Sequence, residues 1–150
     1  MSTKLEPRVV EPEDVEAIHP FGLHMKILLR TEETDGVFSA LLIEHEPGAV
    51  VPPHFHRKQE EYFCVIEGTY ELQIGETKRT VGPGSVAFIP RNTLHTFKNV
   101  GPSVAKMLDW SIPGGQDRYF TRVNELVSSE GFTGDDVNQV HAEFDTLFPS

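Results

Sequence analysis

The sequence has few of the features that would cross-link the chain or anchor it in a membrane. A single cysteine, Cys64, among 150 residues excludes an intrachain disulfide. No apolar run approaches the roughly 20 residues that a membrane-spanning helix needs. The first residues are rich in Pro, Glu and Asp, and they do not resemble a signal peptide. These absences predict a cytoplasmic protein that has no membrane partner.

Positive charge is also scarce. The chain has 13 Lys and Arg residues against 23 Asp and Glu residues, so its formal net charge is −10. Such a surface repels phosphate backbones, and the Lys and Arg residues form no basic run. Nucleic acid is therefore not an expected partner, and we expect a small-molecule ligand or substrate instead.

The pattern of short apolar runs predicts a β-rich protein with a helical end. A chain of this length is expected to form one domain. Gly and Pro separate strand-like runs at residues 25–29, 37–44, 61–67, 70–74, 78–81, 85–89, 93–99 and 104–112. Many short strands with regular turn signals predict an all-β barrel or sandwich. Gly75-Glu76 suits a two-residue hairpin turn with Gly at its first central position.

After Pro113 the apolar period becomes helical. The spacing predicts one helix over residues 115–128 and a second that Asp135-Asp136 caps and that carries Val137, Val140, Phe144, Leu147 and Phe148. We therefore divide the chain into an N-terminal arm at 1–22, a barrel at 23–113, and C-terminal helices at 114–150 that pack on the barrel.

Three histidines and a glutamate predict a metal site. His54 and His56 are two residues apart, so in a strand both side chains point to the same face. Glu61 begins the next predicted strand and can supply an oxygen ligand. His95 lies in a third apolar strand just after a Pro turn, where a buried imidazole needs a partner such as a metal ion. The other histidines, His19, His24, His45 and His141, have no ligand spacing and suit surface or polar-core positions.

These segments resemble the two motifs of the cupin superfamily. The first runs Gly48, five residues, His54-x-His56, four residues, Glu61, six residues, Gly68. The second runs Gly84, five residues, Pro90, one residue, Asn92, two residues, His95, three residues, Asn99. The family usually has Gly where Asn92 stands, and Asn is the best non-Gly residue at positive φ. Residues 111–120 and the following helix further resemble the tail of single-domain quercetin-dioxygenase-like cupins.

The resemblance implies an all-β fold, a double-stranded β-helix (jelly-roll) barrel with two C-terminal α-helices. It also implies one divalent metal ion, bound by His54, His56, Glu61 and His95. The motif spacing favours Glu61 over the adjacent Glu60, which we interpret as a solvated turn residue. The donors suit Fe, Mn, Ni, Co, Cu or Zn, and the sequence does not choose among them.

The resemblance also implies an enzyme. We expect a metal-dependent dioxygenase acting on a small aromatic or flavonol-like substrate, with Glu61 as the catalytic proton acceptor. Phe63 and Phe97 share the faces of Glu61 and His95 and are expected to line the substrate pocket. The alternatives are a non-oxidative metal cupin (a polyketide cyclase or isomerase) and a binding barrel without turnover. Cupins of this appearance are commonly dimers, and sheet edges need covering, so we expect a homodimer.

Overall fold

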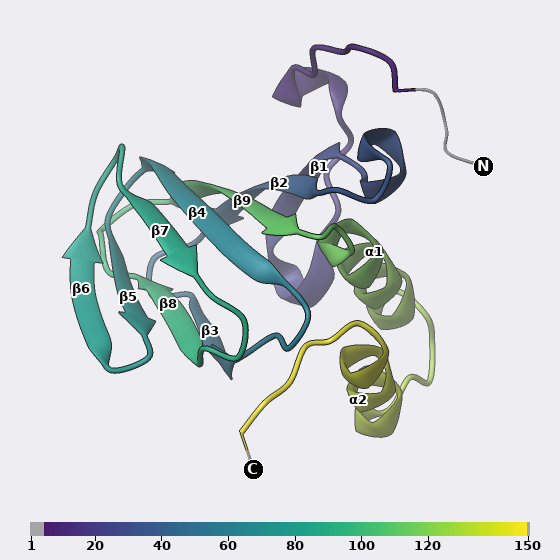
Figure 1. The fold of residues 1–150 in the computed structure, drawn as a ribbon. Helices are drawn as coiled ribbons and strands as arrows, with labels where there is room; N and C mark the ends of the chain where they lie inside the picture. Colours follow the sequence, from purple (N-terminus) through teal and green to yellow (C-terminus); the bar gives the residue numbers. More distant parts are fainter. Residues whose placement is uncertain (1–4, 150) are drawn as a thin grey trace.

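The fold is a sandwich of two antiparallel sheets with two helices on one side. The computed structural model describes residues 5–149. Figure 1 shows the two sheets facing each other. The larger sheet has the strand order β1 (His24–Leu29), β2 (Ser39–His45), β9 (Ala105–Ile112), β4 (Glu60–Glu67) and β7 (Val86–Ile89). The smaller sheet has the order β3 (Val50–His54), β8 (His95–Asn99), β5 (Tyr70–Ile74) and β6 (Thr77–Val81). The predicted all-β jelly roll with two C-terminal helices is confirmed.

Alternation along the strands fills the space between the sheets. Side chains of successive residues point to opposite faces, so every second residue faces inward. The inward set is fully buried at Met25, Leu41, Phe63, Tyr70 and Met107. Burial of such side chains stabilises the fold by roughly 1.5–3 kcal/mol each. The core therefore holds both sheets together and fixes which side chains reach the interior.

The sequence analysis did not predict strand β3. The sequence explains this omission, and the structure explains how the strand forms. Its residues include Pro52 and Pro53, which supply no backbone N–H to a sheet and normally interrupt strands. β3 lies at the edge of the smaller sheet, and its pairing with β8 shifts between Val51 and His54. An edge position and an irregular register accommodate both prolines.

Both predicted turn conformations are confirmed. Ile74 pairs directly with Thr77, so Gly75 and Glu76 form a two-residue loop, and Gly75 has a φ of 58°. Asn92 has a φ of 63°, the left-handed conformation expected for the residue that replaces the family's Gly. Asn92 N also donates to the carbonyl oxygen of His56 at 2.7 Å, which ties the two motif segments together.

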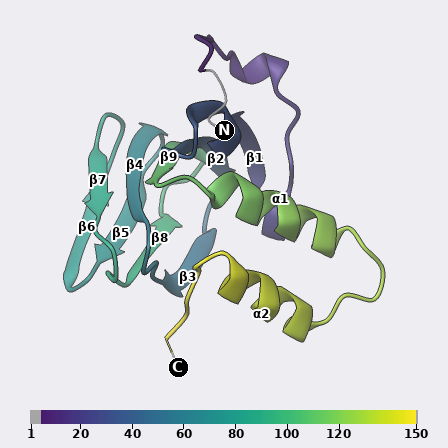
Figure 2. The same ribbon diagram turned by 45° about the vertical axis from the view of Figure 1, so that its right-hand side comes forward.

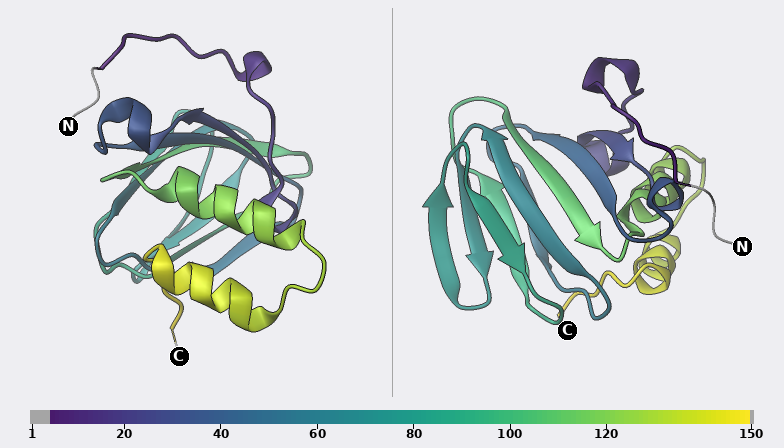
Figure 3. Two further views of the ribbon diagram at one scale, coloured as in Figure 1. Left: turned by 90° about the vertical axis from the view of Figure 1, so that its right-hand side faces the viewer. Right: turned by 45° about the horizontal axis from the view of Figure 1, so that its top comes forward.

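The C-terminal helices are α1 (Gln116–Val127) and α2 (Gly134–Glu143). Figures 2 and 3 show both on one side of the sandwich, with α1 against β2 and α2 beside α1. The predicted cap of α2 is confirmed in part, because Asp136 takes part in it but is not the N-cap residue. The N-cap is Thr133, whose hydroxyl accepts from Asp136 N while Asp136 accepts from Thr133 N. Within the described residues, no helix is long and apolar enough to cross a membrane.

The second helix is also shorter than its apolar pattern predicts. It ends at Glu143, and Asp145 has a φ of 56°, a left-handed conformation that stops a helix. The chain then becomes extended, and Leu147 forms a two-way backbone bridge with Phe55 at 2.9 and 3.0 Å. The last apolar residues therefore lie against the barrel beside the first histidine pair.

Before β1, the chain forms short 3-10 turns at Pro12–Asp14 (η1) and Pro20–Gly22 (η2), and Thr31–Thr34 (η3) follows β1. Ile18 pairs with Met25, and the Lys26 ammonium donates to the Pro12 carbonyl at 2.7 Å. These contacts hold the arm along β1.

Candidate metal centre

The four residues predicted as ligands meet inside the barrel. His54 ends β3, His56 follows two residues later, Glu61 is the second residue of β4, and His95 begins β8. All four side chains are buried. Their nearest ligand atoms all lie within 4.8 Å of one another, which is the separation expected of donors that share one ion. The two sheets thus contribute to one buried cluster.

Backbone carbonyls orient the three imidazoles. Nδ1 of His54, His56 and His95 lies 2.9 Å from the carbonyl oxygens of Pro52, Asp145 and Thr93 respectively. A carbonyl only accepts, so each Nδ1 carries a proton, and Nε2 is the ring atom left to bind an ion. Histidines that bind metals through Nε2 are usually fixed in this way.

The free Nε2 atoms face the buried carboxylate. Nε2 of His56 lies 3.6 Å from one Glu61 oxygen, and Nε2 of His95 lies 3.3 Å from the other. Neither contact meets hydrogen-bond geometry, so both nitrogens lack a hydrogen-bond partner among the residues that the structure describes. Buried nitrogen atoms of this kind normally have a partner. A divalent ion between them would supply it.

The charges of the cluster are linked: burial lowers the pKa of His56, but the Glu61 carboxylate outweighs burial and raises it, whereas His54 and Glu61 favour their metal-binding forms. Burial, reinforced by the neighbouring His95, lowers the pKa of His54 to about 4. Burial raises the pKa of Glu61, but contacts with His56 and His95 outweigh burial and hold that pKa below its ordinary value. Neutral imidazole and ionised carboxylate are the forms that bind a metal ion. The donor set therefore fits one divalent ion.

Glu60 lies outside this cluster. It is the first residue of β4, its side chain is half-exposed, and one of its oxygens lies 3.7 Å from the Arg91 Nε. Successive residues of a strand point to opposite faces, so Glu60 faces outward when Glu61 faces the histidines.

A cavity of about 550 Å³ opens from the cluster. This volume is in the usual range of small-molecule sites. Its walls are mainly apolar: besides the predicted ligands His54, His56 and Glu61, they include Ile43, Val51, Phe97, Tyr119, Phe120 and Phe148. Phe97 thus lines the cavity. Phe63 is not among the lining residues: it is buried, and its ring packs edge-on against that of Phe97 with the centroids 5.0 Å apart.

The cavity also exposes polar groups that the sequence analysis did not select. His45, Asp109 and His141 line it, and one polar atom of each has no hydrogen-bond partner among the described residues. Burial, together with the charge of Glu61, raises the pKa of Asp109 well above its ordinary value. Strand parity could have identified two of them, since His45 shares the inward face of Leu41 and Asp109 shares that of Met107.

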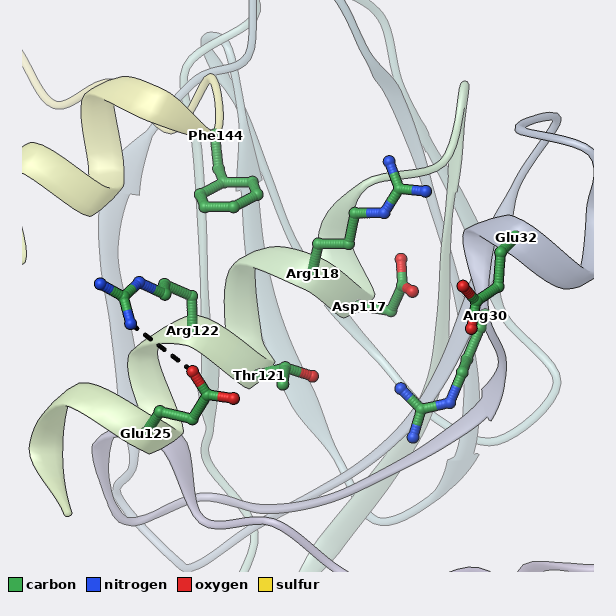
Figure 4. A pocket seen from close by; sticks show the side chains of 8 residues that line it. All are labelled: Arg30, Glu32, Asp117, Arg118, Thr121, Arg122, Glu125 and Phe144. Atoms are coloured by element: carbon green, nitrogen blue, oxygen red, sulfur yellow. Dashed lines mark ion pairs between the residues drawn. The ribbon is translucent and has the colours of Figure 1, made fainter.

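A second hollow, of about 300 Å³, lies between α1 and η3. Figure 4 shows its charged rim, including the ion pair of Arg122 with Glu125 at 3.6 Å. The Asp117 carboxylate accepts from both the backbone N–H and the hydroxyl of Thr31. Asp117 therefore anchors the start of α1 to the barrel, a structural role.

Comparisons with known proteins agree with this geometry. Residues 41–111 match the cupin domain family. The polyketide synthase CurC of Streptomyces cyaneus is 31% identical over 107 residues, covering 70% of this chain and 69% of that protein. The protein SchB of Streptomyces halstedii is 27% identical over 108 residues, covering 71% and 78%. This chain belongs to the cupin superfamily.

Solved structures show the same fold. The polyketide cyclase RemF from Streptomyces resistomycificus aligns with a TM-score of 0.61 at 26% identity, covering 71% of this chain and 80% of that one. KdgF from Halomonas sp. aligns with a TM-score of 0.67 at 22% identity, covering 75% and 99%.

Proposed function

We propose that this protein is a metal-dependent cupin enzyme that cyclises or isomerises a polyketide-like aromatic substrate without using oxygen. The observation that carries the proposal is the buried cluster of three histidines and one glutamate in a largely apolar cavity. Its support from relatives is the similarity to CurC and to the cyclase RemF. The dioxygenase expected from the sequence lacks such support.

The residues of the chain would divide the work as follows. His54, His56, His95 and Glu61 would hold the ion, which when bound polarises a substrate carbonyl as a Lewis acid. The Glu61 carboxylate, ionised and buried, would accept a proton from the carbon next to that carbonyl. Apolar walls such as Phe97 and Phe120 would hold the flat substrate and exclude water. These are the requirements of a ring closure between a carbonyl and an enolate carbon.

The test compares substrate loss with oxygen uptake. Metal-loaded protein is given a synthetic aromatic poly-β-ketone, and products are identified by mass spectrometry with an oxygen electrode in the same vessel. We expect a product of unchanged mass, or one that has lost water, at the same rate with and without oxygen. Metal-free protein is the control. Product formation that requires oxygen would reject the proposal of a cyclase and would instead support the dioxygenase expected from the sequence.

Glu61→Gln separates chemistry from binding. The amide retains the size of the carboxylate but no longer accepts a proton, so turnover is expected to fall by at least roughly 100-fold. Substrate binding to variant protein with its metal restored should change far less. Equal losses in both measurements would show that Glu61 acts only in holding the site together.

A further inference from the structure

The cavity has a second polar position, His45, well away from the metal cluster. His45 is the last residue of β2 and faces inward with Leu41 and Ile43. Only 1% of its surface is exposed, yet it lines the cavity and its Nε2 has no partner among the described residues. A buried polar atom without a partner costs free energy. A ligand in the cavity would recover this cost.

The hydrogen bond on the other side of the ring determines what Nε2 offers. His45 Nδ1 lies 2.8 Å from the Tyr70 hydroxyl, and Tyr70 is fully buried and does not line the cavity. If Nδ1 donated, the tyrosine O–H would have no acceptor in the core. The hydroxyl therefore donates to Nδ1, and the ring proton is on Nε2. His45 thus presents an N–H donor to the cavity.

Its place relative to the metal cluster follows from the strands. Phe97 is two residues after His95 on β8, a step of about 7 Å. The ring centroids of Phe97 and His45 are 5.2 Å apart. The path from His95 over Phe97 to the His45 ring therefore spans on the order of 10 Å. Phe97 and Ile43 make the intervening wall apolar.

We infer that the ligand of this cavity is an elongated aromatic molecule that carries metal-chelating oxygens at one end and an acceptor oxygen at the other, to which His45 Nε2–H donates. The inference of a chelating end rests on the proposed function. The inference of an acceptor oxygen near His45 rests on the contacts of His45 described above. His45 is a specificity-determining residue, because a ligand that lacks the distal oxygen would leave its N–H unpaired.

The charge of His45 narrows the distal group further. Burial lowers the pKa of His45 to about 4, so the ring is neutral near pH 7. A carboxylate at this position would have to pair with a protonated His45, which burial and the hydrogen bond from Tyr70 both disfavour. The distal oxygen is therefore neutral: a methoxy, phenol or ketone oxygen.

The experiment uses two probes that differ only at this end. Zn²⁺-loaded protein, which is redox-inert, is titrated with 3-hydroxyflavone and with its 4′-methoxy derivative, and binding is followed by the shift in visible absorbance. Both probes chelate through the same oxygen pair, and only the second has a distal acceptor. We expect the methoxy probe to bind roughly 5-fold more tightly, the usual effect of one neutral hydrogen bond.

The same titrations in His45→Phe and His45→Gln assign the preference. Phe removes the donor and Gln retains one, so the preference should disappear in the first variant and largely return in the second. Zinc content and thermal unfolding show whether each variant is folded. If His45→Phe does not fold, the inference is judged from the other two proteins. The wild-type protein and His45→Gln should both prefer the methoxy probe, and a wild-type protein without this preference overturns the inference. An unchanged preference in folded His45→Phe, or no binding of either probe to the wild-type protein, overturns the inference.

The outcome is separate from that of the proposed function. The probes report binding without turnover, so a His45-dependent preference in a protein that cyclises nothing would support the second polar position and reject the cyclase. Cyclisation with no effect of the His45 variants on probe preference would do the reverse.

Discussion

Glu60 and Glu61 are adjacent in sequence but have opposite environments. Glu61 lies between two imidazoles, 3.3 and 3.6 Å from their Nε2 atoms, whereas Glu60 faces outward near Arg91. Glu61→Gln should therefore lower metal affinity by at least roughly 10-fold, and Glu60→Gln, the matched control, should leave it unchanged. Competition with a fluorescent zinc chelator measures both. If Glu60→Gln weakened binding more, the wrong carboxylate would have been assigned.

Removing the imidazole of His54 or of His95 tests the rest of the cluster. His54→Ala and His95→Ala each delete a ligand and leave the remaining buried donors without a common partner. We expect both variants to lose most of the metal that the wild-type protein retains, measured by elemental analysis after purification without an affinity tag. His24→Ala is the control, because His24 lies outside the cluster and pairs with Glu44 at 2.8 Å. Full occupancy in both cluster variants would refute the site.

The buried His45 should also make stability depend on pH. Its pKa is about 4 in the folded protein and about 6.5 when unfolded, so the unfolded chain binds more protons between these values. Stability from this residue is present above pH 6.5 and is lost as pH falls. Between pH 7 and pH 5 the loss is roughly 2 kcal/mol. Urea unfolding of metal-free protein at both pH values measures it.

His45→Gln provides the comparison for that measurement, since Gln does not titrate. Other buried histidines, such as His54, contribute equally to both proteins, so the difference between the two losses isolates His45. If the wild-type protein and His45→Gln lost the same free energy of unfolding between pH 7 and pH 5, burial of His45 would not oppose its protonation.

At the level of secondary structure, the local pattern predicted most elements because alternation and turn residues act over a few positions. The strand β5 and the turn at Gly75 were predicted with their observed bounds. β3 was missed because its two prolines normally argue against a strand, and only its edge position, a property of the whole sheet, permits it. The extended end after α2 was missed for a similar reason: its apolar residues fit a helical period, but they pack on the barrel.

That C-terminal segment also holds the predicted metal ligand His56 in place. The Asp145 carbonyl accepts from His56 Nδ1 at 2.9 Å, and its carboxylate accepts from the backbone N–H groups of Arg57 and Lys58 at 3.0 and 2.7 Å. Asp145→Gly tolerates the left-handed backbone but removes the carboxylate. We expect metal affinity to fall by roughly 10-fold, measured by chelator competition.

Two further variants complete that test. Asp145→Asn retains one acceptor oxygen and tolerates positive φ, so its affinity should be intermediate. Asp135→Ala removes an exposed carboxylate of α2 and should have no effect. A loss of thermal stability in Asp145→Gly without any loss of metal affinity would show that the segment supports the fold and not the ligand.

At the scale of the molecule, the motifs predicted the fold and all four members of the cluster, because a cupin motif encodes strand parity and turn geometry together. The contents of the cavity were harder to predict. Phe63 and Phe97 have the same parity as the predicted ligands, yet only Phe97 lines the cavity, and Phe63 is buried with its ring packed edge-on against Phe97. Which inward residue meets a cavity and which meets another side chain depends on all strands at once.

The outer face of the larger sheet bears on the expected homodimer, which remains a prediction. Tyr62 of β4 stacks on Phe88 of β7 at 5.2 Å and on Trp110 of β9 at 5.5 Å. Phe88 and Val86 are 52% and 65% exposed. Clusters of exposed apolar side chains on one face often mark protein–protein contacts. β7 is also an edge strand of this sheet, and its free backbone groups need covering.

We therefore expect a dimer formed through this aromatic face. Phe88→Glu would place a charge in the contact and should shift the protein to monomer at micromolar concentration, as measured by light scattering. Val37→Glu is the matched control, because Val37 is 55% exposed but lies outside this sheet. Phe88→Glu should retain its metal, since the side chain of Phe88 points away from the cluster. A monomeric wild-type protein would reject the dimer, and a dimeric Phe88→Glu beside a dimeric wild type would move the contact to another face.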